Sequence, residues 1–353
     1  MTLRRTQPAG LGLGLALLMG GAACSEGCAR ELPATQAADK EPIELDALQH
    51  LLWPEGPAPY KLMAEAELAA LERLITLLWS RAPNGMLMPG QARRAARDAD
   101  IAGVELHDLQ LAHEGKVEQF WVVAESTADR RGRGAYVFRL GPLRGSEGRS
   151  RTEILLQAPH TRFDTHTGEI AVGMFIESEL EARPARALML NSAHRHAQLD
   201  GTRDKREPAS QNPADAAHRE DHPFARVSDR LVHDHAVAIV QLHGFGRDEA
   251  AGEPDVIVSA GRKQPRAASL GVAERLRPVL GEFEVRHYGD GIDRLGGRTN
   301  VQGRATRDAG RCFVHIETSA RVRGKLREDR ALRSRFAAAI LGGSARELRG
   351  GCR

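Results

Sequence analysis

Three apolar segments of this sequence end in residues that can bind a metal ion or transfer a proton. The segment "EILLQAPH" ends at His160 and is soon followed by Asp164, "AIVQLH" ends at His243, and "CFVHIE" ends at Glu317. A catalytic zinc site takes about three ligands of the His, Asp or Glu type and leaves one position open for water. The sequence therefore predicts that His160, Asp164 and His243 bind zinc. Glu317 would be the carboxylate that moves a proton beside it.

Each of these assignments has an alternative in the same sequence. His166 and Glu169 follow in the same loop, so either could replace Asp164 as the second ligand. The segment "PHTRFDTHTG" also fits an ordinary turn, since Asp, Thr and Gly are common turn formers. A histidine at a strand end is often a hydrogen-bonded structural residue, and Glu317 could pair with an arginine that follows it. The ligand set is a hypothesis that rests on the joint occurrence of these residues at strand ends.

Short apolar runs bounded by Gly, Pro or charged residues predict β-strands along much of the chain. They lie at 116–126, 134–141, 151–160, 235–246, 254–261, 282–291 and 310–319. Amphipathic patterns predict helices at 270–282 and 326–343. This alternation favours an α/β fold with a mixed, mainly parallel sheet and helices on both faces. Because ligands bind at the carboxyl ends of strands in such sheets, the polar residues above should converge on one crevice.

Other regions of the chain have different patterns. Residues 46–112 predict an N-terminal helical region packed on the core, with leucines at three- and four-residue spacing, and 113–353 would form the α/β domain. Residues 177–198 predict helical or irregular structure. The very polar stretch 200–220 predicts an excursion at the surface. His218 and the nearby His222 could bind metal from one face of a helix, but their polar setting favours a surface loop that lines the cleft.

The N-terminus "MTLRRTQPAGLGLGLALLMGGAAC" has the order of an export signal: basic residues, a short apolar run and small residues at its exit. It resembles a bacterial lipoprotein leader. We expect residues 1–23 to be this signal, Cys24 to be the lipidated first residue of the mature chain, and 24–45 to be a flexible tether. Ordinary secretion and a cytosolic chain with a chance leader are the alternatives. In an oxidising compartment Cys312 and Cys352 could form a disulfide.

Composition argues against one class of partner. The formal net charge is +3, with 50 basic and 47 acidic residues interleaved along the chain, which is not the pattern of a nucleic-acid surface. With 353 residues, 41% of them apolar, the chain can bury one sizeable core or two smaller ones. We expect a folded protein that acts on a small molecule or a peptide.

The motifs "APHTRFD", "IVQLHGF" and "FVHIETSARVR" resemble the zinc carboxypeptidase-like amidohydrolase superfamily, particularly N-formylglutamate amidohydrolases and poly-gamma-glutamate hydrolases. The resemblance covers about 153–339 through scattered motifs. It implies a phosphorylase/hydrolase-like three-layer α/β/α sandwich, one zinc ion bound by His160, Asp164 and His243, and Glu317 as general base. The carboxypeptidase pattern is His-x-x-Glu, whereas this chain has His-x-x-x-Asp, so the identity of the second ligand stays open.

The same resemblance implies a site for a substrate carboxylate. Relatives carry an Asn-Arg pair for this purpose, and Asn191 and Arg195 are the matching residues here. Arg321 lies in the arginine-containing stretch after the late strand. Arginine suits this role because its planar guanidinium can hold a carboxylate with two hydrogen bonds. Asn300 and Arg304, in a Gly-rich loop that would flank the cleft, are further candidate contacts.

We therefore predict an exported, zinc-dependent amidohydrolase or peptidase, tethered by lipid to the cell envelope and facing the periplasm or the exterior. It would cleave an amide bond in a small N-acyl amino acid, a gamma-glutamyl compound or an envelope peptide. Gly244 and Gly246 have no side chains and would leave the cleft open beside the metal. A cell-wall amidase and a non-catalytic lipoprotein that keeps the fold for binding are the alternatives.

Overall fold

The structure of the chain is a computed structural model, and it describes residues 41–52, 54–143, 152–177, 184–246, 252–342 and 347. The predicted export signal, Cys24 and most of the predicted tether lie outside the described residues, as does Cys352. Cys312 is disulfide-bonded, and its pairing with Cys352 stays a prediction. Within the described part of the chain, no helix has both the length and the apolar character that crossing a membrane requires.

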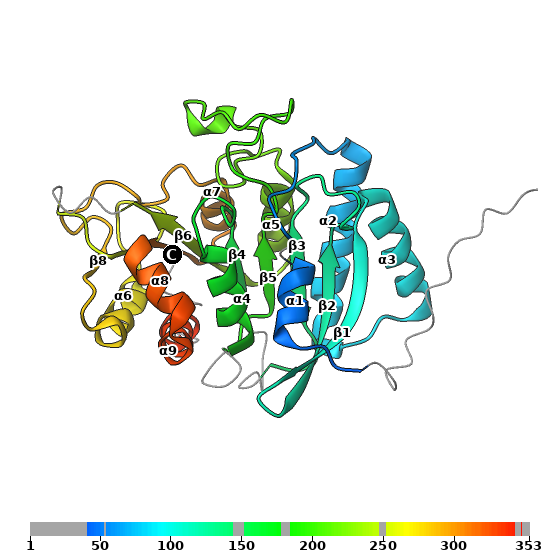
Figure 1. Cartoon of the computed structure of the whole chain (residues 1–353), viewed down its shortest axis with the longest axis horizontal. Coiled ribbons are helices and arrows are strands. Elements are labelled where there is room, and N and C mark those ends of the chain that lie inside the picture. The colour runs from blue at the N-terminus through cyan, green and yellow to red at the C-terminus, as the bar shows by residue number, and fades with distance from the viewer. Residues whose placement is uncertain are drawn as a thin grey trace, which may run out of the picture. The chain divides into compact units, whose positions relative to one another are not determined.

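The described strands form one mixed sheet in the order β1-β2-β3-β5-β4-β6-β9-β7-β8 (Figure 1). Their bounds are β1 Glu105–His113, β2 Lys116–Ala124, β3 Ala135–Arg139, β4 Glu153–Ala158, β5 Ala187–Leu190, β6 Val237–Phe245, β7 Val256–Ser259, β8 Val285–His287 and β9 Phe313–Ser319. The neighbours β5-β4-β6-β9 run parallel. The carboxyl ends of these central strands therefore meet at one edge of the sheet.

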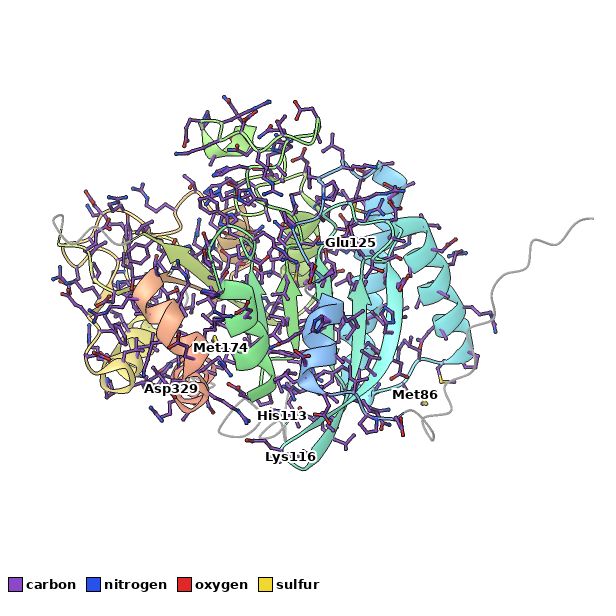
Figure 2. The ribbon with its side chains drawn as sticks, in the orientation of Figure 1. Met86, His113, Lys116, Glu125, Met174 and Asp329 are labelled. Carbon is purple, nitrogen blue, oxygen red and sulfur yellow. The ribbon has the colours of Figure 1, made fainter. Side chains whose placement is uncertain are left out.

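The prediction of a mixed α/β sheet is confirmed, but the sheet is less parallel than expected. β1-β2, β2-β3, β3-β5 and β7-β9 all pair antiparallel. The outer strands on one side form an antiparallel meander, and His113 and Lys116 lie at the turn between β1 and β2 (Figure 2). An antiparallel pair needs only a tight turn, whereas a parallel pair needs a crossover.

Helices cover apolar side chains on both faces of the sheet. Their bounds are α1 Leu45–Leu52, α2 Glu65–Arg81, α3 Pro89–Ala102, α4 Thr167–Glu177, α5 Pro223–Asp234, α6 Ala267–Leu280, α7 Val301–Asp308, α8 Ala320–Glu328 and α9 Arg330–Leu341. Leu156 and Val240 pack in one core with α4, α6, α8 and α9. Their chain neighbours Leu155 and Ile239 pack in another core with α2, α3 and α5, because successive side chains of a strand point to opposite faces.

Two strands lie where the sequence predicted other structure. β1 begins inside 46–112 and ends at His113, so the predicted boundary at 112/113 cuts through a strand, although α1, α2 and α3 in the same region are helices. β1 is an edge strand, and most of its residues are only partly buried, so it lacks a clear apolar alternation. β5 lies inside 177–198, and its four residues are too few to reveal a period.

Candidate metal centre

A tight loop after β4 brings His160 and Asp164 together. The backbone N–H groups of Phe163 and Asp164 both donate to the His160 carbonyl at 2.8 Å. The Thr167 hydroxyl, at the start of α4, donates to the Asp164 carbonyl at 2.7 Å. The chain therefore turns back on itself between the strand and the helix, and the two side chains face the same space.

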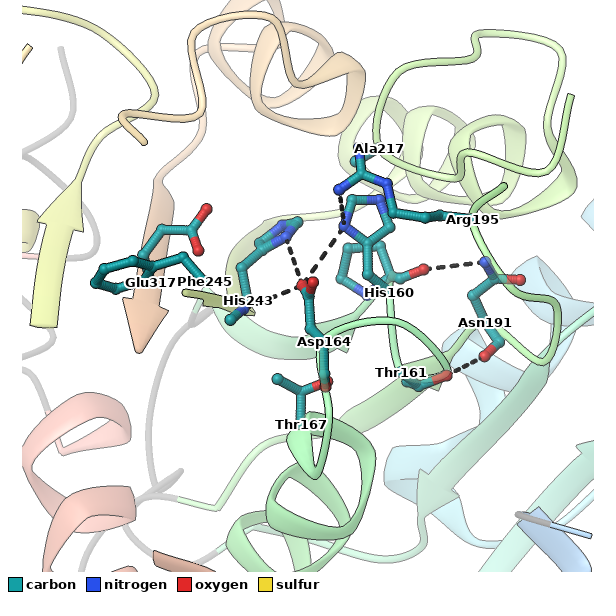
Figure 3. Close-up of polar contacts among 12 residues, drawn as sticks. His160, Thr161, Asp164, Thr167, Asn191, Arg195, Ala217, His243, Phe245 and Glu317 are labelled. Carbon is teal, nitrogen blue, oxygen red and sulfur yellow. Dashed lines mark hydrogen bonds and ion pairs between the residues drawn. The ribbon is translucent and has the colours of Figure 1, made fainter. Parts of the chain in front are cut away.

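His243 enters that space from the neighbouring strand β6 (Figure 3). Asp164 Oδ2 lies 3.5 Å from His160 Nδ1 and 3.4 Å from His243 Nδ1. The three side chains are buried, and their potential ligand atoms all lie within 4.8 Å of one another. The Gly244 N–H also donates to Asp164 Oδ2 at 3.0 Å. The structure thus brings together the three residues that the sequence predicted as ligands.

The contact with Asp215 on the far side of His160 decides which of its nitrogens carries the hydrogen. His160 Nε2 lies 2.8 Å from Asp215 Oδ1, and an ionised carboxylate can only accept, so this nitrogen carries the proton. In the neutral ring Nδ1 then presents its lone pair toward Asp164. The Arg195 guanidinium lies 3.3 Å from this nitrogen, and a metal ion between the ring and Asp164 would further offset the repulsion between the lone pair and the carboxylate oxygen. The donor set of this site therefore fits a metal ion, and Asp215 orients His160 as a second carboxylate behind a ligand.

Burial and hydrogen bonding shift the pKa values in this cluster in different directions. Burial lowers the pKa of His243 to about 4. Burial opposes ionisation of Asp164, but its close contacts with the His160 and His243 rings hold the pKa of Asp164 well below its ordinary value. Burial and the Arg195 charge oppose protonation of His160, yet the nearby Asp215 and Asp164 carboxylates raise its pKa overall. Asp164 is therefore anionic at neutral pH.

Glu317 lies beside His243 on the adjoining strand β9, with which His243 is in direct register. Its carboxyl group is buried, and Oε2 has no hydrogen-bond partner among the described residues. Burial first, and then the Asp164 charge, raise the pKa of Glu317 well above its ordinary value. His315, two residues earlier on the same strand face, places Nε2 at 3.6 Å from Glu317 Oε1. The predicted proton carrier thus borders the predicted metal ligands with one oxygen available.

Arg195 reaches the same cluster from the loop after β5. Its Nη2 forms an ion pair with Asp215 Oδ2 at 2.6 Å, and its Nη1 lies 3.3 Å from His160 Nδ1. The guanidinium lies over the Phe163 ring, 5.2 Å from its centroid. The side chain keeps 19% of its surface exposed, so it is accessible from solvent. Arg195 thus lies beside the predicted ligands, and its role in binding a substrate carboxylate stays a prediction.

Asn191 does not share that role in the structure. Its amide nitrogen donates to the Pro159 carbonyl at 3.0 Å, and its amide oxygen accepts from the Ala193 N–H at 3.2 Å. The side chain is 1% exposed. Asn191 therefore pins the His160 loop to the end of β5, and its polar atoms are already used.

Arg321 points away from the cluster, and Arg323 lies near it instead. Arg321 lies over the Phe283 ring and within 3.9 Å of Asp255 Oδ2. Arg323 is buried, and it donates to the carbonyls of Thr165, Phe245 and Thr318. Because residues two apart on a helix face different directions, only one of Arg321 and Arg323 can reach the site. The structure does not place Arg321 in the cluster, and its contact with substrate stays a prediction.

The alternative second ligands lie outside the cluster. His166 Nδ1 contacts Glu169 Oε2 at 3.3 Å, and both side chains are partly exposed at the start of α4. Glu169 also pairs with Arg327 at 2.9 Å. Neither is in a group of described residues that could hold a metal ion together with His160. Of the three candidates for the second ligand, only Asp164 faces both histidines.

The segment that was predicted to be a surface excursion supplies a residue that sequence analysis missed. Residues 200–208 are exposed, but Asn212 and 214–217 are buried, and Asp215 touches His160, His218 and Arg195. A local signal was present, because Asp215 is flanked by alanines in "ADAA". His222 caps the N-terminus of α5, stacks on Tyr60 and lies outside the described metal-competent groups.

The Gly-rich loop before α7 does not supply the predicted contacts. Asn300 is buried, caps α7 by accepting from the Gly303 N–H and donates to Gln241. Arg304 forms an ion pair with the exposed Glu220. These polar groups are used in structural hydrogen bonds and in a surface pair, so the prediction that they contact substrate is not supported.

Gly244 provides space for Arg323, a role that differs from the open cleft predicted from the sequence. A Cβ at this position would overlap the Arg323 guanidinium, whereas a Cβ at Gly246 would meet nothing within 4 Å. Gly244→Ala should therefore displace a buried cation from its carbonyl acceptors and lower the free energy of unfolding by about 1–3 kcal/mol. Chemical denaturation measures this change. Gly246→Ala is the matched control, and equal stability of the two variants would contradict this account.

The chain has only weak similarity to proteins of known structure. No family model and no curated protein matches the chain. A candidate carboxypeptidase A from Shewanella denitrificans OS-217 is similar at 14% identity and a TM-score of 0.39, covering 69% of this chain and 64% of its own. A metallo-carboxypeptidase from Burkholderia cenocepacia is similar at 12% identity and a TM-score of 0.38, covering 80% of this chain and 69% of its own. The chain thus spans less than two thirds of the first of these proteins, and similarities this weak establish neither its family nor its reaction.

Proposed function

We propose that this protein is a metal-dependent hydrolase of amide or peptide bonds. The observation that carries the proposal is the convergence of two imidazole nitrogens and one carboxylate on a buried point. Asp164 Oδ2 lies 3.5 Å and 3.4 Å from the Nδ1 atoms of His160 and His243. The Asp215 carboxylate supports the proposal because it holds the proton of His160 on the opposite nitrogen.

Zinc is the ion that this donor set favours. Two histidines and one carboxylate are a common catalytic zinc set with room for a further ligand. Bound zinc would supply Lewis-acid polarisation of a substrate carbonyl and lower the pKa of water toward ~7. In the fold that the resemblance implies, a three-layer phosphorylase/hydrolase-like sandwich, the ion would lie at the carboxyl edge of the central parallel strands.

Glu317 and Arg195 would carry the remaining steps of hydrolysis. Glu317 Oε2, which has no partner among the described residues, would take a proton from the attacking water as its oxygen bonds to the carbonyl carbon. When the C–N bond breaks, Glu317 would return that proton to the leaving nitrogen, so atoms and charges balance. Arg195, partly exposed beside His160, would bind the negative charge of the carbonyl oxygen or of a substrate carboxylate.

The substrate class in this proposal is a small acylated amino acid, a gamma-glutamyl compound or an envelope peptide that carries a carboxylate. A cell-wall amidase would use the same residues on a larger, glycan-linked substrate, and a non-catalytic lipoprotein would keep only the binding function. We propose in addition that the protein is exported and lipid-anchored at Cys24. This part of the proposal rests on the sequence of the N-terminus alone.

Metal content tests the proposal directly. Protein purified without chelators should contain about one zinc ion per chain, and extraction with a chelator should abolish hydrolysis that added zinc restores. Elemental analysis gives the stoichiometry. Release of amino acid from N-formyl, gamma-glutamyl and unmodified peptide substrates, compared with solubilisation of peptidoglycan, divides the substrate classes. A chain that neither contains nor binds zinc would contradict the proposed function.

A further inference from the structure

The ring nitrogen of His243 that faces away from the candidate metal centre contacts a buried network of side-chain amides. His243 Nε2 lies 2.8 Å from the side-chain oxygen of Gln241, two residues earlier on β6. We call Gln157, Gln241, Asn300 and Gln302 the amide network, and each of them is at most 3% exposed. The network lies behind the proposed metal ligands, and the hydrolytic mechanism above does not use it.

Gln241 is the centre of the amide network, and all of its hydrogen-bonding positions are filled. Its amide nitrogen donates to Gln157 Oε1 at 3.0 Å and to Gln302 Oε1 at 3.3 Å. Its amide oxygen accepts from Asn300 Nδ2 and faces His243 Nε2. An amide offers two donor hydrogens and two acceptor lone pairs. If Gln241 were turned over, its oxygen would face the oxygens of Gln157 and Gln302.

Backbone groups fix which way each neighbouring amide points. Gln302 Nε2 lies 2.6 Å from the Ala216 carbonyl, which can only accept, so Gln302 Oε1 must face Gln241. The Gly303 N–H, which can only donate, lies 2.8 Å from Asn300 Oδ1, so Asn300 Nδ2 must face Gln241. These anchors are independent of each other. Together they require the side-chain oxygen of Gln241 to point at His243.

A third anchor lies at the other end of the network. The Ser228 hydroxyl donates to the Phe224 carbonyl at 2.7 Å and accepts from Gln157 Nε2 at 2.8 Å. Gln157 Oε1 is therefore left to accept from Gln241. The Phe224 carbonyl of α5 thus sets the direction of the hydrogen bonds from Ser228 through Gln157 to Gln241. Turning over the side-chain amide of Gln157 or Gln241 would leave buried polar atoms without a partner.

We infer that the amide network holds His243 in the tautomer with its hydrogen on Nε2, so that the Nδ1 lone pair always faces Asp164. Gln241 Oε1 can only accept, so the facing nitrogen must donate. Without that acceptor, the Asp164 carboxylate would draw the ring hydrogen to Nδ1, where it would compete with a metal ion. Gln241 is thus a positioning residue for the site described under the proposed function, and its effect on metal binding rests on that function.

Nitrogen NMR of the metal-free protein tests the tautomer independently of catalysis. In wild-type protein the ¹⁵N shifts of His243 should show a protonated Nε2 and an unprotonated Nδ1. Gln241→Met removes the acceptor at nearly constant volume, and it should shift the hydrogen to Nδ1 and weaken Zn²⁺ binding by about 10- to 100-fold. Gln198→Met is the matched control. Gln198 is equally buried and donates to backbone carbonyls of His196 and Asp204, outside the amide network.

The possible results separate this inference from the proposed function. An Nδ1–H tautomer in the metal-free wild type would overturn the inference, whether or not the variants fold. Unchanged Zn²⁺ affinity in a folded Gln241→Met variant would also overturn it, because the network would then have no effect at the metal. If wild-type protein shows the Nε2–H tautomer but binds no Zn²⁺, the tautomer assignment is supported and the proposed hydrolase function fails.

Discussion

Replacing His243 with alanine should abolish stoichiometric zinc binding and reduce hydrolysis to the background rate. The variant leaves only His160 and Asp164 of the proposed ligand set. Loss of a residue that supports a ligand can lower metal affinity by about 100-fold, and loss of the ligand itself should lower it by at least as much. Competition with a chromophoric chelator measures the affinity, and elemental analysis measures the bound metal. Because His243 is buried, circular dichroism must show that the variant folds.

His166→Ala is the informative control for this experiment. His166 belongs to the same loop as His160 and Asp164, but its side chain pairs with Glu169 at the surface end of α4. The variant should bind zinc as the wild type does. Loss of zinc in His166→Ala together with its retention in His243→Ala would show that the loop binds metal in a different arrangement from the one proposed here.

Replacing Glu317 with glutamine should preserve the zinc stoichiometry and lower kcat by about 10²- to 10⁴-fold. Glutamine has nearly the same shape, but its amide cannot take a proton from water and return it to the leaving nitrogen. The carboxylate of Glu317 lies in register with His243, and its Oε2 has no partner among the described residues, so the change removes a proton carrier without breaking a hydrogen bond of that oxygen. Steady-state kinetics on the best substrate gives the ratio.

Glu177→Gln provides the matched control for Glu317→Gln. Glu177 is also a buried glutamate, but it lies at the C-terminal end of α4, where it pairs with Arg333. Its replacement should lower stability through the broken ion pair and leave kcat close to that of the wild type. Full activity of a metal-loaded Glu317→Gln variant would remove Glu317 from the mechanism.

One simple geometric rule explains why the sequence predicted that the candidate ligands lie close together. His160 and His243 follow or end apolar runs, and the structure shows these runs as neighbouring parallel strands. Parallel strands bring their carboxyl ends to one edge, so residues distant in sequence become adjacent without any detailed knowledge of packing. The pairing of His243 with Glu317 follows from the same rule applied to β6 and β9.

The strands that sequence analysis missed share a physical cause. β1 is an edge strand whose side chains are mostly half-buried, and β5 has only four residues. Neither presents the long, alternating apolar pattern that separates a strand from a loop. The strand pairing in the sheet, which no local pattern encodes, therefore decided that the outer strands run antiparallel.

By itself, the sequence determined which apolar runs are buried and which histidines and carboxylates stand at their ends, because burial and side-chain chemistry are local properties. Only the tertiary structure decided that Asp215 supports His160, that Arg323 and not Arg321 lies near the site, and that Gln241 faces His243. Those choices depend on hydrogen-bond directions between distant segments. A hydrogen bond is made or lost over less than an ångström, which composition and spacing cannot resolve.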